Sequence, residues 1–427
     1  MQRNPNLCER QRTNRLVMQP ANYIKGGIIM SVIRELIDEA VSKKLSEYQT
    51  IALDIHKTPE VSNHEFFASK TLGGQLKKEG FEVKSDVAGH PTGFDARYKS
   101  SKPGPIIVFL AEYDALPGIG HACGHNLYGA TASLAAAALK EIIDDAGGEI
   151  RVYGTPGEEG GENGSAKGSF VKNGYFDDVD FALGLHPGYD HGLTKASLAN
   201  DPVDVEFFGK SAHAAGAPEK GINALDAVIQ VYNASNALRQ HLTDDVRIHG
   251  VITNGGAAAN VVPDYASARF YLRAKSRPIL NDLYNKFENI VKGAALQTGA
   301  TCKFGLFQNS VDNIVPTPLF DEIYEKHLSG YGEFIPSEPA HKGLGSSDVG
   351  NVSQVVPTIQ PSIKISDKYI AGHSIEFREA SKSELGLNSI GLGAKVLAHT
   401  ALDLILDPNL LKKIKEQHSE NVKNQNS

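Results

Sequence analysis

The sequence contains few cysteines, and this scarcity excludes one class of fold. Its 427 residues include three cysteines, Cys8, Cys123 and Cys302, at widely separated positions. Three distant cysteines cannot form the disulfide framework that holds small secreted domains together. Because free thiols are typical of a reducing compartment, we expect a cytoplasmic protein.

Long hydrophobic runs and clusters of basic residues are also missing from the sequence. No apolar run approaches the ~20 residues needed to span a bilayer. The first 30 residues lack the apolar core, about 7–15 residues long, of a secretory signal. The net charge is -7, and the Lys and Arg residues are scattered along the chain. We therefore expect neither a membrane nor a nucleic acid as a partner.

The chain is long enough for more than one domain, because single cores seldom grow beyond about 250–300 residues. Residues 1–30 are expected to lie outside the working fold, as a non-native or disordered extension. Residues 1–29 mix Asn, Gln, Arg and Pro without a clear period. We hypothesise that Met30 is the natural start. Intact-mass analysis of the native protein tests this, and a chain longer than one that starts at Met30 would refute the hypothesis.

Helices and buried strands alternate in the first half of the chain. Apolar residues at helical spacing predict helices over 31–53 and 65–78, and an Ala-rich segment predicts one over 127–143. Short continuous apolar runs at 106–111, 150–154 and 181–185 are typical of strands that are buried on both faces. This alternation predicts an α/β fold with a mainly parallel sheet sandwiched by helices.

The pattern of predicted helices and strands changes between residues 197 and 308. The pattern there predicts, in order, a strand, a helix, two strands, a helix and a strand, over 203–208, 222–238, 248–253, 266–274, 279–296 and 301–307. This is the order of a ferredoxin-like α+β unit, which we interpret as a domain inserted into the first. The first domain, residues 31–196 and 309–427, resumes with a strand over 355–363 and a helix over 375–404, and a polar tail follows Lys412.

Residue types that bind metals follow three of the buried strands. Glu112 and Asp114 come after the first strand, Glu158-Glu159 after the second and His186 after the third. Because ligands bind beyond the carboxyl ends of the strands in open parallel sheets, these side chains are expected at one edge. Adjacent carboxylates are also common as solvated loop residues. In the functional interpretation one of them binds metal and the other is a general base.

The loop that contains Cys123, Gly124 and His125 precedes the Ala-rich helix on the same edge. Thiolate and imidazole together favour zinc or a neighbouring transition metal. A lone Cys-x-His is more often a buried structural pair, but its convergence with the strand ends favours a metal site. His373, before the last predicted helix, carries little weight by itself.

Three polar residues of the inserted segment are candidates for substrate contact. His213 lies in a loop of small residues, Asn260 supplies an amide, and Arg273 supplies a guanidinium suited to a carboxylate. Judged by spacing alone, these residues could equally stabilise turns and form a surface salt bridge.

Seven motifs together resemble the dinuclear metallopeptidases of the aminoacylase and glutamate carboxypeptidase type, peptidase family M20. They span the chain after Met30 and lie at 112–117, 120–127, 154–161, 185–188, 210–214, 260–264 and 345–353. The nearest branch resembles amidohydrolases such as p-aminobenzoyl-glutamate hydrolase and aminoacylase-like dipeptidases. The chain departs from common family patterns in having Glu112 where many members carry a ligand His, and Asn126 where Asp is usual.

The resemblance implies a site with two divalent metal ions, zinc or manganese. Asp114 would orient a ligand, and Glu158 would be the general base. Residues 197–308 would form a lid and the interface of a homodimer. His213 would reach the partner's active site and stabilise the oxyanion, and Asn260 and Arg273 would bind the substrate. The implied metal ligands are Cys123, His125, Glu159, His186 and His373.

We therefore expect a metal-dependent amidohydrolase that uses a metal-activated water on a small N-acyl amino acid, aminobenzoyl-glutamate-like or dipeptide substrate. One alternative is a cysteine hydrolase with Cys123 as nucleophile, which would need no metal and would survive chelation. A second alternative is a non-catalytic binding protein on the same fold. The adjacent carboxylates Glu158 and Glu159 argue against it.

Overall fold

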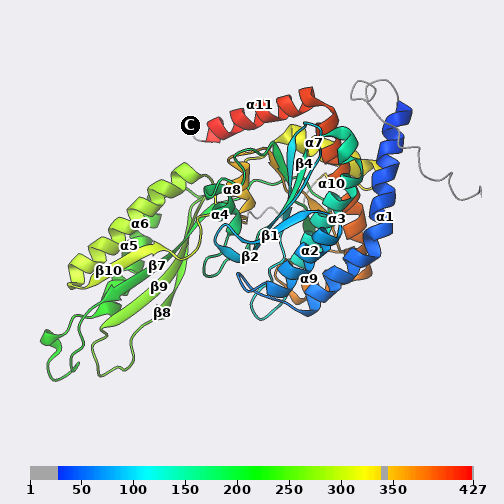
Figure 1. Cartoon of the computed structure of the whole chain (residues 1–427). Helices are drawn as coiled ribbons and strands as arrows, with labels where there is room; N and C mark the ends of the chain where they lie inside the picture. The colour runs from blue at the N-terminus through cyan, green and yellow to red at the C-terminus, as the bar shows by residue number, and fades with distance from the viewer. Residues whose placement is uncertain (1–26, 338–344, 426–427) are drawn as a thin grey trace, which may run out of the picture.

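The chain forms two bodies, a larger α/β body and an elongated second body that extends from one side of it (Figure 1). The structure is a computed structural model that describes residues 27–337 and 345–425. Residues 1–26 lie outside the described range, so the prediction for the N-terminal extension stays a prediction. Helix α1 (Gly27–Lys57) begins shortly before Met30.

A six-stranded sheet forms the centre of the larger body. Its strand order is β1-β2-β4-β3-β5-β11. Strands β4, β3, β5 and β11 run parallel, which confirms the mainly parallel sheet. The hairpin of β1 and β2 is antiparallel and was not among the predicted elements. The strands are β1 (Glu82–Val87), β2 (His90–Lys99), β3 (Ile106–Ala111), β4 (Glu149–Gly154), β5 (Phe181–Leu183) and β11 (Thr358–Ile359).

Alternate side chains of β3 face opposite layers of helices. Ile107 and Phe109 belong to the core formed with α1, α2 (Phe66–Lys78), α3 (His125–Ala146), α7 (Pro318–Gly330) and α10 (Glu384–Leu406). Val108 and Leu110 belong to a separate core with α4 (Ala166–Lys172) and α8 (Val349–Ser353). Because successive residues of a strand point to opposite faces, a continuous apolar run is what a sheet covered on both sides requires.

The prediction of one long helix over 375–404 is wrong. The structure has two helices, α9 (Ile375–Ala380) and α10, with a break at residues 381–383. The side chain of Ser383 accepts a hydrogen bond from the backbone nitrogen of Gly386 and so caps the new helix. The interpretation of the segment after Lys412 as a polar tail is also wrong. It lies in helix α11 (Pro408–Gln425), which buries Ile414 and His418.

Helix α10 is the one helix of the described chain that is long and apolar enough to cross a membrane by length and composition. However, 78% of its apolar window is buried inside the protein. Its small residues permit this close packing, since a side chain added at Gly393 would collide with Leu185. The apolar character of α10 is therefore explained by its place in the core beside α3.

The second body is a four-stranded antiparallel sheet with two helices. Its strand order, β10-β7-β9-β8, confirms the predicted ferredoxin-like unit. Its own core joins sheet residues such as Phe207 and Phe270 to helix residues such as Val228 and Phe287. The elements are β7 (Ala199–Phe208), α5 (Ala224–Arg239), β8 (Arg247–Asn254), β9 (Tyr265–Ala274), α6 (Arg277–Thr298) and β10 (Thr301–Leu306).

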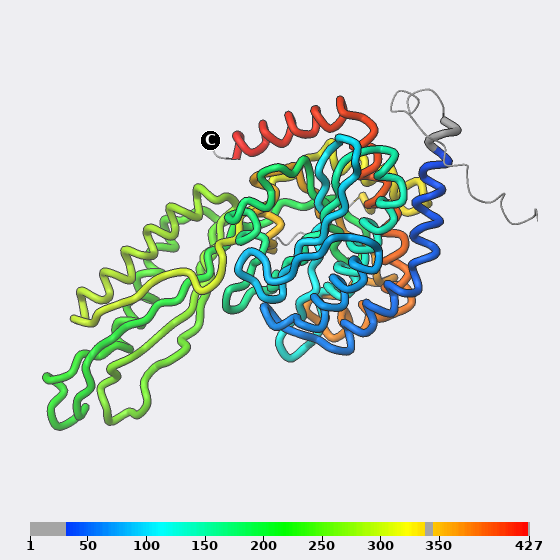
Figure 2. The backbone as a smooth tube through the Cα atoms, viewed as in Figure 1, coloured from blue at the N-terminus to red at the C-terminus, as the bar shows by residue number. Residues whose placement is uncertain are grey.

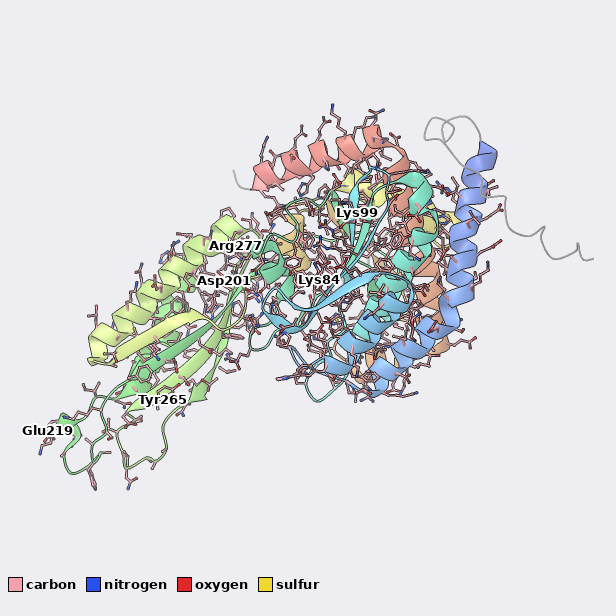
Figure 3. All side chains as sticks on the ribbon, in the orientation of Figure 1. Lys84, Lys99, Asp201, Glu219, Tyr265 and Arg277 are labelled. Carbon is pink, nitrogen blue, oxygen red and sulfur yellow. The ribbon has the colours of Figure 1, made fainter. Side chains whose placement is uncertain are left out.

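The two bodies meet where the chain enters and leaves the second one, and Figure 2 shows the two passes side by side. Figure 3 labels Asp201 and Arg277 at this junction. The Arg277 guanidinium donates to Asp201 over 2.8 Å and also pairs with Asp312, a residue of the larger body. A short parallel pair, β6 (His186–Gly188) with β12 (Ser362–Lys364), and a 3-10 helix, Pro218–Lys220, complete the elements of the described residues.

Candidate metal centre and active site

The side chains that follow three neighbouring strands lie together at one edge of the central sheet. Glu112 follows β3, Glu158 follows β4, and His186 stands just after β5 as the first residue of β6. Glu112 and Glu158 form one group of ligand atoms with His125, and His186 forms another with Cys123 and His125; within each group the atoms lie within 4.8 Å of one another. The parallel order of β4, β3 and β5 explains this convergence, because it puts the carboxyl ends of the three strands side by side.

His125 lies at the centre of the cluster, at the start of α3. Its Nδ1 lies 3.0 Å from Oδ1 of Asp114 and 3.1 Å from the Asp114 carbonyl oxygen. Both oxygens can only accept when the carboxyl group is ionised, so Nδ1 carries a proton and Nε2 is the nitrogen that faces the rest of the cluster. The second carboxylate oxygen of Asp114 accepts a 2.9 Å hydrogen bond from the backbone nitrogen of Glu159. Asp114 thus fixes the ring of His125 and holds the Glu159 loop.

Cys123 and His186 approach each other from different segments. The Cys123 Sγ lies 3.4 Å from Nε2 of His186, and Nδ1 of His186 donates to the Pro187 carbonyl oxygen over 2.7 Å. Gly124 makes the close approach possible. It has a φ of 78°, and a Cβ there would lie 2.8 Å from a side-chain carbon of Pro187.

His373 and Glu159 form the outer side of the cluster. Nε2 of His373 lies 3.4 Å from a carboxylate oxygen of Glu159, and the His373 side chain is 57% exposed. The backbone nitrogen of His373 donates to the carbonyl oxygen of Ala122, which fixes this loop beside the Cys123 loop. The structure therefore brings together the five residues that the resemblance implies as metal ligands.

The donor set fits divalent cations. Cys123, His125 and His186 form one group of convergent ligand atoms, and Cys123, Glu159 and His373 form a second group that shares the thiol. Buried atoms of this cluster lack hydrogen-bond partners among the described residues, namely Nε2 of His125 and Oε1 of Glu159. Each such atom costs about 1–3 kcal/mol, and a bound cation would remove that cost. Thiolate, imidazole and carboxylate ligands suit zinc and its neighbours.

Burial and like charges shift the titration of the acids in the cluster. Burial, followed by the charges of Glu112 and Glu159, raises the pKa of Glu158 well above its usual range. Burial also raises the pKa of the Cys123 thiol, with Glu159 adding to the shift. Burial alone would raise the pKa of Asp114, but the charge and the hydrogen bond of His125 outweigh this effect and lower the pKa. A cation at this site would deprotonate a coordinating thiol.

A buried lysine adjoins the cluster, and the sequence interpretation missed it. Lys167 and Asp348 are 0% and 1% exposed. Nζ of Lys167 lies 2.6 Å from Oδ1 of Asp348 and 2.9 Å from Oε1 of Glu112. Asp348 lies inside one of the motifs that carry the resemblance, whereas Lys167, among Ser, Ala and Gly, gives no signal of burial in the sequence.

A cavity of about 340 Å³ opens beside the cluster. Arg273, on β9 of the second body, lines it and donates to Oγ of Ser346 over 3.2 Å. Arg273 forms no ion pair within the described residues, and burial lowers the pKa of its guanidinium. A larger hollow of about 910 Å³ lies between Ile365 and Asn388 and is lined by none of the clustered ligands. The cavity's lining includes Cys123, Glu158, Glu159, His186, Arg273 and His373.

Two of the predicted substrate-contact residues lie away from this cavity. His213 and Asn260 are both exposed, and they adjoin each other, since Ala214 donates its backbone N–H to the Asn260 carbonyl oxygen. They share their part of the second body with Glu219, which Figure 3 labels at its far end. Neither residue lines the cavity of its own chain.

Comparison with known proteins places the chain among hydrolases. Residues 202–299 match a family model described as a peptidase dimerisation domain. The chain is 34% identical to the Xaa-Arg dipeptidase of Homo sapiens, and the alignment covers 90% of each protein. It is 30% identical to a chain of the p-aminobenzoyl-glutamate hydrolase of Escherichia coli, over 92% of this chain and 96% of the relative.

Solved structures share the fold. An aminobenzoyl-glutamate utilization protein from Klebsiella pneumoniae matches 86% of this chain and 98% of its own, with a TM-score of 0.69 and 20% identity. A dinuclear metal-binding peptidase from Bacillus subtilis matches 85% of this chain and 99% of its own, with a TM-score of 0.61 and 18% identity. The relatives confirm the resemblance seen in the motifs, and this chain belongs to the M20 family of metal-dependent peptidases and amidohydrolases.

Proposed function

We propose that this protein binds two divalent cations and hydrolyses the amide bond of a small dipeptide or N-acyl amino acid with a free carboxylate. One observation carries the proposal. Two groups of convergent ligand atoms share Cys123, and Glu158, which belongs to neither group, lies beside them in the same cavity. The proposed ligands are Cys123, His125, Glu159, His186 and His373.

When bound, the cations would polarise the scissile carbonyl and acidify the attacking water. The protein's own acid–base group is Glu158. Its carboxylate takes a proton from the water as the new C–O bond forms at the carbonyl carbon. It then gives the proton to the nitrogen of the leaving amine as the C–N bond breaks. Burial and the charges of Glu112 and Glu159 raise the pKa of Glu158, which makes its carboxylate a stronger proton acceptor.

The substrate class follows from the cavity. Its volume of about 340 Å³ suits a small molecule, and Arg273 offers a partly buried guanidinium with no acidic partner among the described residues. A free carboxylate on the substrate would supply that partner through paired hydrogen bonds. The hydrolysis of Xaa-Arg dipeptides and of p-aminobenzoyl-glutamate, named for the relatives, fits such a substrate.

We further propose a homodimer formed through residues 197–308, with His213 and Asn260 serving the partner's site. The match to a dimerisation domain supports this. Strand β8 is an edge of its sheet and exposes Val251 and Ile252, which are 62% and 46% exposed. Such an edge pairs readily with a second copy. In this proposal the partner subunit's His213 stabilises the oxyanion, which explains why His213 lies away from its own cavity.

Mixing two inactive variants tests the shared site. Glu158→Ala lacks the proton acceptor, and His213→Ala lacks the group that acts in the partner. Mixed dimers contain one site with both residues intact, so we expect activity to return when the two kinds of chain exchange partners. If the mixture stays inactive while size measurements show exchanged dimers, His213 does not act across the interface.

The metal-dependent reaction is tested by chelation. A panel of dipeptides, N-acyl amino acids and an aminobenzoyl-glutamate-like amide is assayed before and after chelation, and then after addition of zinc or manganese. We expect activity to disappear on chelation and to return with one of the two metals. A cysteine hydrolase based on Cys123 would keep its activity, and a binding protein would cleave no member of the panel. Burial already weighs against a free thiolate nucleophile, because it raises the pKa of Cys123.

We also propose that the protein works in a reducing compartment such as the cytoplasm. Cys123 must stay reduced to bind a cation, because only the thiolate is a metal ligand. Cys123 and Cys302 are both free thiols in the structure, which supports the proposal.

A further inference from the structure

We propose that Glu112 is an additional ligand of the cation that His125 holds, and that Lys167 and Asp348 fix Glu112 in that position. The inference rests on the proposed two-cation site and adds a residue to it. It starts from a third group of convergent ligand atoms, which Glu112, His125 and Glu158 form.

The free oxygen of Glu112 faces Nε2 of His125. Oε2 of Glu112 lies 3.2 Å from Nε2 of His125, and both side chains are fully buried. Neither atom has a hydrogen-bond partner within the described residues. Because Nδ1 of His125 contacts Asp114, Nε2 is the nitrogen that faces Oε2 of Glu112 in a water-poor interior. A cation between the two atoms would be coordinated by both.

The other oxygen of Glu112 is fully occupied. Oε1 lies 2.9 Å from the ammonium group of Lys167 and 3.4 Å from Nε2 of Gln360. The amide group of Gln360 also donates to the hydroxyl group of Tyr128. These contacts fix the plane of the carboxylate and leave Oε2 as the one atom of Glu112 that is free for the site.

Two buried carboxylates, Asp348 and Glu112, share Lys167. Asp348 accepts from the ammonium group through Oδ1 and from the backbone N–H of Lys167 through Oδ2, at 2.6 and 3.0 Å. This ion pair already neutralises the lysine. Burial lowers the pKa of Lys167, but the charges of Asp348 and Glu112 raise it above its usual value, so the ammonium form persists. Glu112 therefore shares its lysine contact with a second carboxylate, which holds Lys167 through two contacts.

A buried carboxylate is retained when it is paired or binds a metal. Glu112 shares a lysine with Asp348, and its free oxygen lies 3.2 Å from Nε2 of His125, a proposed metal ligand. Metal coordination uses that free oxygen and compensates its charge. A purely structural role for Glu112, as a counter-ion of Lys167, would leave Oε2 without a partner.

Cobalt substitution of the full-length protein tests the inference without any substrate. The chelated protein is titrated with Co²⁺, and visible absorption and metal content are recorded. We expect Glu112→Gln to change the d–d bands of one cobalt ion and to weaken its binding by at least about 10–100-fold, the loss usual for removing a supporting group. The second ion should bind as in the parent protein. Lys167→Met should weaken the same ion, because it releases the Glu112 carboxylate.

Glu162→Gln is the matched control, since Glu162 is an exposed carboxylate of the neighbouring loop. A further variant, Glu112→Asp, keeps the charge opposite Lys167 and protects the test against loss of folding. It should also alter the bands, because its shorter side chain withdraws the oxygen. If folded Glu112→Gln and Glu112→Asp keep the d–d bands and the cobalt affinity of the parent protein, the inference about Glu112 is refuted and the proposed function is unaffected. A parent protein that binds no Co²⁺ would overturn the proposed function as well.

Discussion

Asp114 connects His125 to the Glu159 loop through its two carboxylate oxygens. Oδ1 lies 3.0 Å from Nδ1 of His125, and Oδ2 accepts from the backbone nitrogen of Glu159 over 2.9 Å. The first contact sets the tautomer of a proposed ligand, and the second sets the position of another. A carboxylate behind a histidine ligand is a common means of fixing the ring and raising its basicity.

Replacing Asp114 by Asn should weaken metal binding while leaving all five proposed ligands in place. The amide can turn its NH2 group towards His125 and so favour the wrong tautomer. We expect a loss of affinity on the order of 10–100-fold, measured by titration of the chelated protein with Zn²⁺. Asp86→Asn, on the exposed end of the β1–β2 hairpin, is the control. Equal affinities of the two variants would contradict the role assigned to Asp114.

Glu158→Ala should retain its cations and lose nearly all turnover. The expected loss of kcat is about 10²–10⁴-fold, because the variant lacks the group that moves the proton. Metal content and kcat are measured on the same sample, with Glu162→Ala as the control from the same loop. Retained turnover would discard Glu158 as the general base, and loss of metal would make it a ligand instead.

The chemistry at the sheet edge was predictable because topology alone places it there. A continuous apolar run such as 106–111 indicates a strand buried on both faces, and parallel strands end at a common edge. The residues that follow three such strands, together with the Cys123 loop, therefore had to converge. His373 follows no strand of the central sheet and lies in none of the seven motifs, so only the family resemblance implied its role.

The parts that could not be predicted depend on tertiary contacts. Lys167 lies among small residues, which is usual for an exposed helix start, and only the approach of Asp348 and Glu112 makes its burial possible. The break before α10 depends on Ser383, whose capping role is clear only when the chain turns there. The charged β1 strand has a mostly exposed pattern and gave no apolar run to find.

Arg273→Met should raise KM for substrates with a free carboxylate and have a small effect on those whose carboxylate is amidated. The guanidinium is the cation that lines the cavity without an acidic partner within the described residues, so its loss removes one charge-assisted contact. A loss of about 1.5–3 kcal/mol corresponds to roughly 10–150-fold in kcat/KM. Arg269→Met is the control, because Arg269 lies on the same strand and pairs with Asp204. An equal effect on both substrate classes would refute carboxylate recognition by Arg273.

Glu65→Gln should stabilise the metal-free protein at high pH. Burial and the charge of Asp114 raise the pKa of Glu65 to about 8, while the unfolded chain titrates near ~4.3. The stability that protonated Glu65 contributes is complete below about pH 4.3 and is lost as the pH rises through about 8. Glutamine is unaffected by pH and can still accept from the Gly157 backbone nitrogen, as Glu65 does.

The melting temperature of chelated Glu65→Gln should therefore exceed that of the parent protein by about 2 °C or more at pH 8.5. The difference should shrink as the pH falls towards 5. A constant difference across this range would mean that Glu65 is ionised in the folded protein at every pH tested.

The number of cations bound per chain decides whether the proposed two-cation site exists. The chelated protein is dialysed against Zn²⁺ or Mn²⁺, and bound metal is measured by mass spectrometry beside Cys123→Ser and His186→Ala variants. We expect two ions per chain of the parent protein and fewer in each folded variant. A parent protein that binds none, or variants that bind two ions with unchanged affinity, would refute the site and the metal-dependent hydrolysis that depends on it.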